Sequence, residues 1–136
     1  IRKELTNEWK NKGLKEGVQF ATLTDIITKA WADKTTKEYK ILKGLKKENL
    51  RDNMTNTELI LNMLAEASAK DISQAVNPKD FEESKTVARQ GGNVAKVAMK
   101  ELEAKTGKKV VTALNAKAVL TESKTAKILN IKKPKN

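Results

Sequence analysis

Apolar residues recur at helical spacing along most of the chain. At the start, Ile1, Leu5 and Trp9 are four residues apart, and Gly13 follows where a helix with this spacing would end. Residues four apart lie on one face of a helix, and glycine is the residue most common just after a helix end. The first segment is therefore predicted to be a short amphipathic helix.

The apolar stripe of the next segment predicts a second helix over residues 20–33, with Thr22 or Thr24 as candidate caps at its start. A third, short helix follows a turn. Its candidate N-cap is Thr35 or Thr36, and Gly44 marks its end.

The longest apolar stretch follows residues 55–58, which read Thr-Asn-Thr-Glu. This is a capping box, in which the threonine hydroxyl and the glutamate carboxylate each accept a hydrogen bond from an amide at the helix start. The helix that follows, residues 56–76, is apolar around more than half its circumference, which is wider than a surface helix needs. We expect it to be the central helix of the fold. The apolar positions are Leu59, Ile60, Leu61, Met63, Leu64, Ala67, Ile72 and Ala75.

Asn77 and Pro78 end this pattern, and a second long helix is predicted from Phe81 to the residues before Gly107. Small residues on one face of it, including Gly91 and Gly92, would allow a neighbouring backbone to come close. Each glycine costs about 1 kcal/mol relative to alanine inside a helix. Either close packing compensates for that cost or the helix kinks at this pair.

These patterns predict an all-α fold, a compact bundle of five or six helices around the helix near residues 56–76, without a substantial sheet. Residues 108–112 are expected to be extended, and residues 113–129 have a weaker helical pattern. We divide the chain into a helical domain, residues 1–120, and a basic carboxy-terminal tail, residues 121–136, which is partly helical or frayed. With only five aromatic residues, the core is expected to be mainly aliphatic.

The net charge of +11 on 136 residues implies an anionic partner, with nucleic acid the first candidate. The chain contains no cysteine, which fits a cytoplasmic protein. No apolar run approaches the roughly 20 residues of a membrane helix, so we expect no membrane association. The chain opens within a helical pattern and is interpreted as a fragment of a longer protein.

The last long helix carries a basic ladder, which consists of Lys85, Arg89, Lys96 and Lys100. These residues fall within a sector of about 60° and extend over about 20 Å. Such a ladder could follow a nucleic-acid backbone, although a solvated face is the more common meaning of a lysine run. If the lysines of residues 37–43 lie on the same side of the molecule, the two stripes form one surface. The candidate nucleic-acid-binding residues are Lys37, Lys40, Lys43, Lys46, Lys47, Lys85, Arg89, Lys96, Lys100, Lys108 and Lys109.

Two other functions are weaker candidates. The second and third predicted helices have the outline of a helix-turn-helix, whose second helix would enter the major groove, but many helical corners of this shape never touch DNA. Catalysis near neutral pH is not expected, because the chain has no histidine and no cysteine. The sequence predicts no metal site, no cofactor and no phosphate-cradling glycine loop.

Three blocks of the chain, taken in order, resemble the bacterial DNA damage-inducible protein D family: KEYKILKGLKKENLRDNMTNTELILNMLAEAS, FEESKTVARQGGNVA and LEAKTGKKVV. The resemblance covers residues 1–113 and fades beyond residue 120. It implies a non-catalytic regulator of the DNA damage (SOS) response, usually preceded by a BRO-type amino-terminal domain that is missing here.

The resemblance also implies a protein partner, a RecA-type recombinase filament. The alternative to DNA binding is therefore a protein-interaction or dimerisation module, which includes a homodimer. Within the first matching block, Arg51 and Asp52 could form a salt bridge or contact a partner, and we interpret them as structural because they come just before a helix start.

Overall fold

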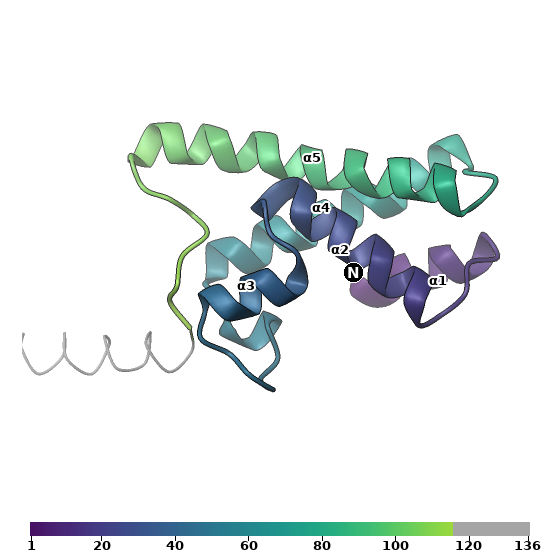
Figure 1. Ribbon diagram of the computed structural model, residues 1–136. Coiled ribbons are helices and arrows are strands. Elements are labelled where there is room, and N and C mark those ends of the chain that lie inside the picture. Colours follow the sequence, from purple (N-terminus) through teal and green to yellow (C-terminus); the bar gives the residue numbers. More distant parts are fainter. Residues whose placement is uncertain (116–136) are drawn as a thin grey trace, which may run out of the picture.

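The computed structural model describes residues 1–115, and within them it contains five α-helices and one short 3₁₀ helix but no strand (Figure 1). The all-α prediction is therefore confirmed. The predictions for the tail, residues 121–136, lie outside the described residues. The elements in chain order are α1 (Arg2–Asn11), α2 (Val18–Ala32), α3 (Thr36–Leu42), η1 (Arg51–Asn53), α4 (Asn56–Val76) and α5 (Phe81–Thr106).

Two helix starts carry the capping boxes that their sequences encode. The hydroxyl of Thr35 accepts a hydrogen bond from the backbone N–H of Glu38 at 3.2 Å, and the hydroxyl of Thr55 accepts one from Glu58 at the same distance. In both boxes the glutamate carboxylate accepts a bond from the threonine amide in return. These bonds satisfy amides that a helix start would otherwise leave without partners, so the boundaries of α3 and α4 are set locally.

The predicted cap of α2 was wrong. The helix begins at Val18, after Gly17, whose positive φ of 84° suits glycine. Thr22 and Thr24 lie inside the helix, where their hydroxyls donate to the backbone carbonyls of Val18 and Phe20 at 2.7 and 2.8 Å. A threonine can bond back to the preceding turn as readily as it can cap, and its sequence position alone does not distinguish the two.

The two longest helices form an antiparallel hairpin, and α5 packs along both α4 and α2 (Figure 1). A four-residue connection, Asn77 to Asp80, joins α4 to α5, so the break predicted at Asn77 and Pro78 is confirmed. α1 packs on α4, and the short α3 packs on α2. The helix α5 therefore contacts two different elements along one face.

The glycine pair of α5 is where those two contacts are closest, and the helix continues through it without a break. A Cβ atom built on Gly91 would lie 2.6 Å from the backbone N and Cα of Ala69 in α4. A Cβ atom on Gly92 would lie 2.6 Å from the carbonyl oxygen of Ile27 in α2 and 2.5 Å from the Cβ of Ala30. Close packing on both sides thus compensates for the low helix propensity of the pair.

We predict that Gly92→Ala lowers the free energy of unfolding by about 1–3 kcal/mol, because the added methyl group overlaps backbone atoms of α2 that cannot move aside. Helix propensity alone would change stability in the opposite direction by about 1 kcal/mol. Chemical denaturation monitored by circular dichroism measures the difference. As a control, Asn93→Ala at the exposed neighbouring position should stabilise by no more than about 0.7 kcal/mol. A more stable Gly92→Ala variant would contradict the close contact.

Candidate nucleic-acid interface

The buried face of α4 is partly polar, which the apolar pattern did not predict. Its buried residues include Glu58, Asn62 and Glu66, which follow one another at intervals of four. By contrast, Ile60 is 64% exposed and Leu64 is 37% exposed, although both were expected to be part of the apolar surface. A buried charge is tolerated only when oppositely charged or hydrogen-bonding groups surround it, so each of these polar residues needs partners from elsewhere in the chain.

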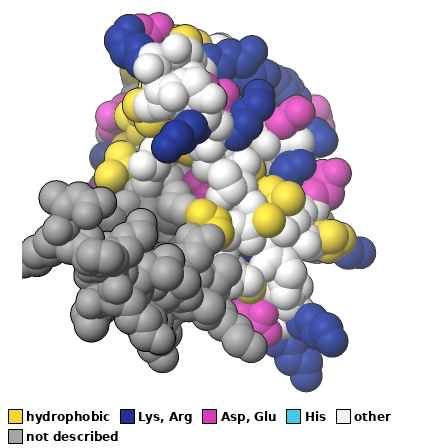
Figure 2. Space-filling view, turned by 90° about the vertical axis from the view of Figure 1, so that its left-hand side faces the viewer, with side chains coloured by type: hydrophobic (Ala, Val, Ile, Leu, Met, Phe, Trp, Pro, Cys, Tyr) yellow, Lys and Arg dark blue, Asp and Glu magenta, His cyan; other side chains and the backbone are white. Residues whose placement is uncertain are grey.

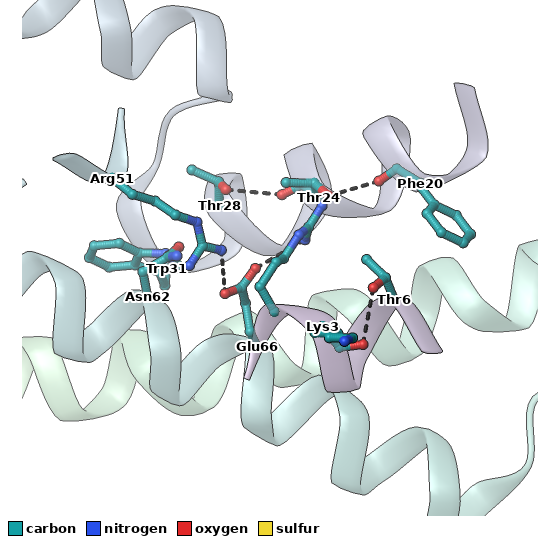
Figure 3. Close-up of polar contacts among 10 residues, drawn as sticks. Lys3, Thr6, Phe20, Thr24, Thr28, Trp31, Arg51, Asn62 and Glu66 are labelled. Atoms are coloured by element: carbon teal, nitrogen blue, oxygen red, sulfur yellow. Dashed lines mark hydrogen bonds and ion pairs between the residues drawn. The ribbon is translucent and has the colours of Figure 1, made fainter. Parts of the chain in front are cut away.

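The carboxylate of Glu66 accepts hydrogen bonds from two arginines that lie in distant segments of the chain (Figure 3). Arg2 donates to Oε2 of Glu66 at 3.0 Å, and Arg51 donates to Oε1. One helical turn away, Nε1–H of Trp31 donates to Oδ1 of Asn62 at 3.2 Å. The expectation that Arg51 is structural is thus confirmed, but its partner is Glu66 rather than the adjacent aspartate.

Lys43 was predicted to lie on an exposed basic face, and this prediction is wrong. Its side chain is fully buried, and its Nζ lies 2.7 Å from Oε1 of Glu58. The hydroxyl of Tyr39 donates to the other oxygen of that carboxylate. The helical wheel explains the error, because Lys43 follows Tyr39 by four residues and shares its buried face, whereas it lies about 120° around the helix from Lys37. Burial raises the pKa of Tyr39, and the hydrogen bond to Glu58 raises it further.

The same ammonium group anchors the segment after α5, residues 107–115, which we term the strap. The Nζ of Lys43 donates to the backbone carbonyls of Thr112, at 2.9 Å, and Leu114. In return, Nδ2 of Asn115 donates to the backbone carbonyl of Lys43 at 2.7 Å. Residues 113–115, the start of the predicted weak helix, are not helical, and the rest of that helix lies outside the described residues.

Two concavities along α5 bring six basic side chains together. The first groove, between α2 and α5, has a volume of about 810 Å³, and the second, near the end of α2 and the strap, has a volume of about 360 Å³. Lys96 lines both, so the two concavities adjoin at its side chain. The first groove also contains Lys29 and Arg89, and the second contains Lys34, Lys100 and Lys109. Figure 2, which looks at the end of the molecule where α5 finishes, shows basic side chains over its upper part, with acidic ones among them.

Three members of the predicted ladder are available to a ligand. Arg89 and Lys100 are exposed and Lys96 is half-buried, and within residues 1–115 none of their side chains forms an ion pair or a hydrogen bond. Lys85 differs, because it pairs with Glu82 at 3.0 Å and its Nζ lies 4.7 Å from the ring centre of Phe81. The basic groove, as we use the term below, consists of Lys29, Lys34, Arg89, Lys96, Lys100 and Lys109.

The sequence did not single out Lys29 and Lys34. Both come from α2 and the turn after it, and they become part of the groove only because α2 is the helix on which Gly92 packs. Nothing in their local sequence shows this, since it depends on a contact between segments that are far apart in the chain. Among the described residues, Asp25 lines the first groove and Asp33 and Glu103 line the second, and Lys29 pairs with Glu38 at 3.6 Å.

The other candidate residues lie elsewhere. Lys40 is half-buried and lines a third concavity, of about 200 Å³, together with Arg51 and Glu66. This concavity is bounded by other α2 residues than those of the first groove, so the two predicted stripes do not line a common groove. The remaining candidates, Lys37, Lys46, Lys47 and Lys108, are exposed and line none of the three concavities.

Within residues 1–115, no group of three or more acidic, histidine or cysteine side chains is placed to hold a metal ion. None of the helices in this part of the chain combines the length and the apolar character that crossing a membrane requires. Comparisons with protein-family models, with curated proteins and with solved structures found no match to this chain.

Removing the buried cation tests the anchor of the strap. Lys43→Met should lower the free energy of unfolding by about 3–5 kcal/mol, because it leaves the carboxylate of Glu58 buried without its ion pair. It should also speed amide hydrogen exchange of residues 110–115 and cleavage by trypsin after Lys109. Lys47→Met, at an exposed position, is the control and should change stability by no more than about 0.5 kcal/mol. Unchanged exchange in the strap would show that other contacts hold it.

Proposed function

We propose that this chain binds DNA through the phosphate backbone, with the basic groove as the binding surface. The observation that carries the proposal is that two concavities adjoin at Lys96 and together are lined by six cations from α2 and the turn after it, α5 and the strap. Phosphate contacts from lysine and arginine supply most of the affinity of sequence-independent DNA binding. The net charge of +11 adds a general attraction to any polyanion.

The chemistry of the first groove suits phosphates and sugars. Beside its cations, its walls carry hydroxyl and amide groups, from Thr22, Thr86, Gln90 and Asn93. The one carboxylate there, Asp25, already accepts a hydrogen bond from the backbone N–H of Thr36 at 3.1 Å. In DNA complexes, neutral hydroxyl and amide groups make many of the hydrogen bonds to phosphates and sugars that lysine and arginine do not make.

The helix-turn-helix alternative has less support. In α3, the helix that would enter the major groove, Lys40 is half-buried, and Lys43 at its C-terminal end is buried. Of these three lysines only Lys37 is exposed, and it is followed by the acidic Glu38, whose pKa is lowered by its capping hydrogen bonds to Thr35 and by Lys29. Positioning on the backbone, rather than reading of base edges by α3, is therefore the function we propose.

We further propose that the chain is a non-enzymatic regulator of the DNA damage (SOS) response that acts in the cytoplasm. The support is the ordered resemblance of three sequence blocks to the DNA damage-inducible protein D family. Those blocks include parts of both helices of the hairpin α4–α5 and the end of α5 that lines the second groove.

Reversing two charges in the groove tests DNA binding. Arg89→Glu combined with Lys96→Glu should weaken binding for every DNA sequence alike and lower the slope of log K against log salt by about one unit for each phosphate that the variant no longer neutralises. Mobility-shift titrations at two salt concentrations measure both quantities. Stability should stay within about 0.5 kcal/mol of the parent chain.

The matched control carries the same change in net charge at another place. Lys3→Glu combined with Lys15→Glu reverses two exposed lysines that line neither concavity of the basic groove. This control should retain most of the affinity. If both double variants bind equally, or if the groove variant binds like the parent at both salt concentrations, the groove is only a solvated surface.

A second candidate function is interaction with a RecA-type recombinase filament or with a second copy of the chain. The observation that favours it is a set of exposed apolar side chains: Val94 and Val97 on α5, which are 42% and 63% exposed, and Ile60 on α4. Val94 lies about 160° around α5 from Lys96, whereas Val97 lies about 60° from Lys100 and so borders the basic groove. Exposed apolar residues that cluster are a common feature of protein-binding surfaces.

Val94→Asn combined with Val97→Asn, which removes the apolar side chains without adding charge, should then abolish co-sedimentation of the chain with recombinase filaments and leave binding to bare DNA unchanged. The groove variant provides the opposite control, since it should lose binding to bare DNA and still join the filament. A dimer that light scattering detects in the parent and not in the valine variant would assign the surface to self-association. Co-sedimentation that survives the valine changes would rule this surface out.

A further inference from the structure

The placement of the aromatic residues restricts which form of DNA the basic groove can hold. The whole chain has five aromatic residues, and all of them are within the described residues. Trp31 and Tyr39 are 0% exposed, and Trp9 is 3% exposed. Phe20 packs against Trp9, with 5.2 Å between ring centres, and Phe81 lies under the ammonium group of Lys85.

None of these rings offers a free face in the grooves. Trp31 is the one aromatic residue that borders either concavity of the basic groove, and its fully buried ring cannot receive a base. The apolar part of the first groove comes instead from the aliphatic Ile26 and Ala30. Proteins that bind single strands without sequence preference stack unpaired bases on exposed aromatic rings, in addition to their charge contacts.

The cations of the groove are placed on two sides. Arg89 and Lys96 project from α5, whereas Lys29 and Lys34 come from α2 and the turn after it. A sugar–phosphate strand between them would meet basic groups on both flanks. In a duplex, the sugar–phosphate strand is exposed while the bases stay paired and stacked on each other. Binding of a duplex therefore requires no aromatic ring of the protein for base stacking.

We infer that the basic groove holds one backbone strand of duplex DNA and discriminates against single strands. This inference rests on the proposed DNA-binding function and adds the form of the substrate. The duplex also carries about one charge per 1.7 Å of its axis, which is roughly twice the charge density of a single strand. This higher charge density also favours binding of the duplex over the single strand. Because the contacts are to backbone, duplexes of unrelated sequence are bound alike.

The test compares a 20-base-pair duplex with an unstructured single strand of 20 thymidines, using the full 136-residue chain and fluorescence anisotropy at two salt concentrations. The duplex should bind about tenfold or more tightly at each salt concentration. A second duplex of unrelated sequence should bind within about twofold of the first. The variant with Arg89→Glu and Lys96→Glu should lose most of this preference, while the variant with Lys3→Glu and Lys15→Glu should keep it.

The outcomes separate the two proposals. Equal or tighter binding of the single strand, still sensitive to the groove variant, would overturn the duplex inference and leave DNA binding by the groove in place. Binding of both forms that is insensitive to the groove variant would overturn the basic groove as the DNA-binding surface, which is the proposed function. Tight duplex binding that differs widely between the two sequences would also overturn the inference, because it would require contacts to base edges.

Discussion

The contact of Gly91 and Gly92 with two neighbouring helices is the constraint on which the arrangement of the molecule depends. At these positions α5 approaches α4 and α2 so closely that a Cβ atom on either glycine would lie 2.5 or 2.6 Å from atoms of the neighbouring helix. This closeness fixes which residues of α2 face α5. The first groove, and with it the meeting of Lys29 with Arg89 and Lys96, is a consequence of that fixed pairing.

A second level of organisation comes from the charges inside the fold. Glu58 and Glu66 are buried on α4, and each is neutralised by basic groups from other segments of the chain. Arg2 connects the start of α1 to α4, and Arg51 connects the 3₁₀ helix η1 to α4. Lys43 connects both the end of α3 and the strap to α4. Buried ion pairs of this kind often add little net stability compared with apolar residues of the same size, but they specify which partners meet.

The two levels differ in how far the sequence predicts them. The starts of α3 and α4 and the end of α4 followed from Thr35, Thr55, Asn77 and Pro78, because those signals act within a few residues. The close approach at the glycines was also predicted, because only close packing or a kink offsets their cost. The burial of Lys43 was not predicted, since a lysine is normally exposed and its partner Glu58 is 15 residues away. Lys29 and Lys34 of the basic groove were also not predicted, because their position beside α5 depends on a contact between segments that are far apart in the chain.

The burial of both tryptophans has a spectroscopic consequence. Trp9 and Trp31 are shielded from water in the folded chain, so their emission is expected at the short wavelengths typical of an apolar environment. A ligand seated in the first groove, which neither tryptophan lines, leaves that environment as it is, whereas unfolding exposes both indoles at once. Intrinsic fluorescence is therefore an indicator of the integrity of the core, and a shift in the emission of Trp9, which lines neither groove, on adding a ligand would mean that the helices themselves had moved.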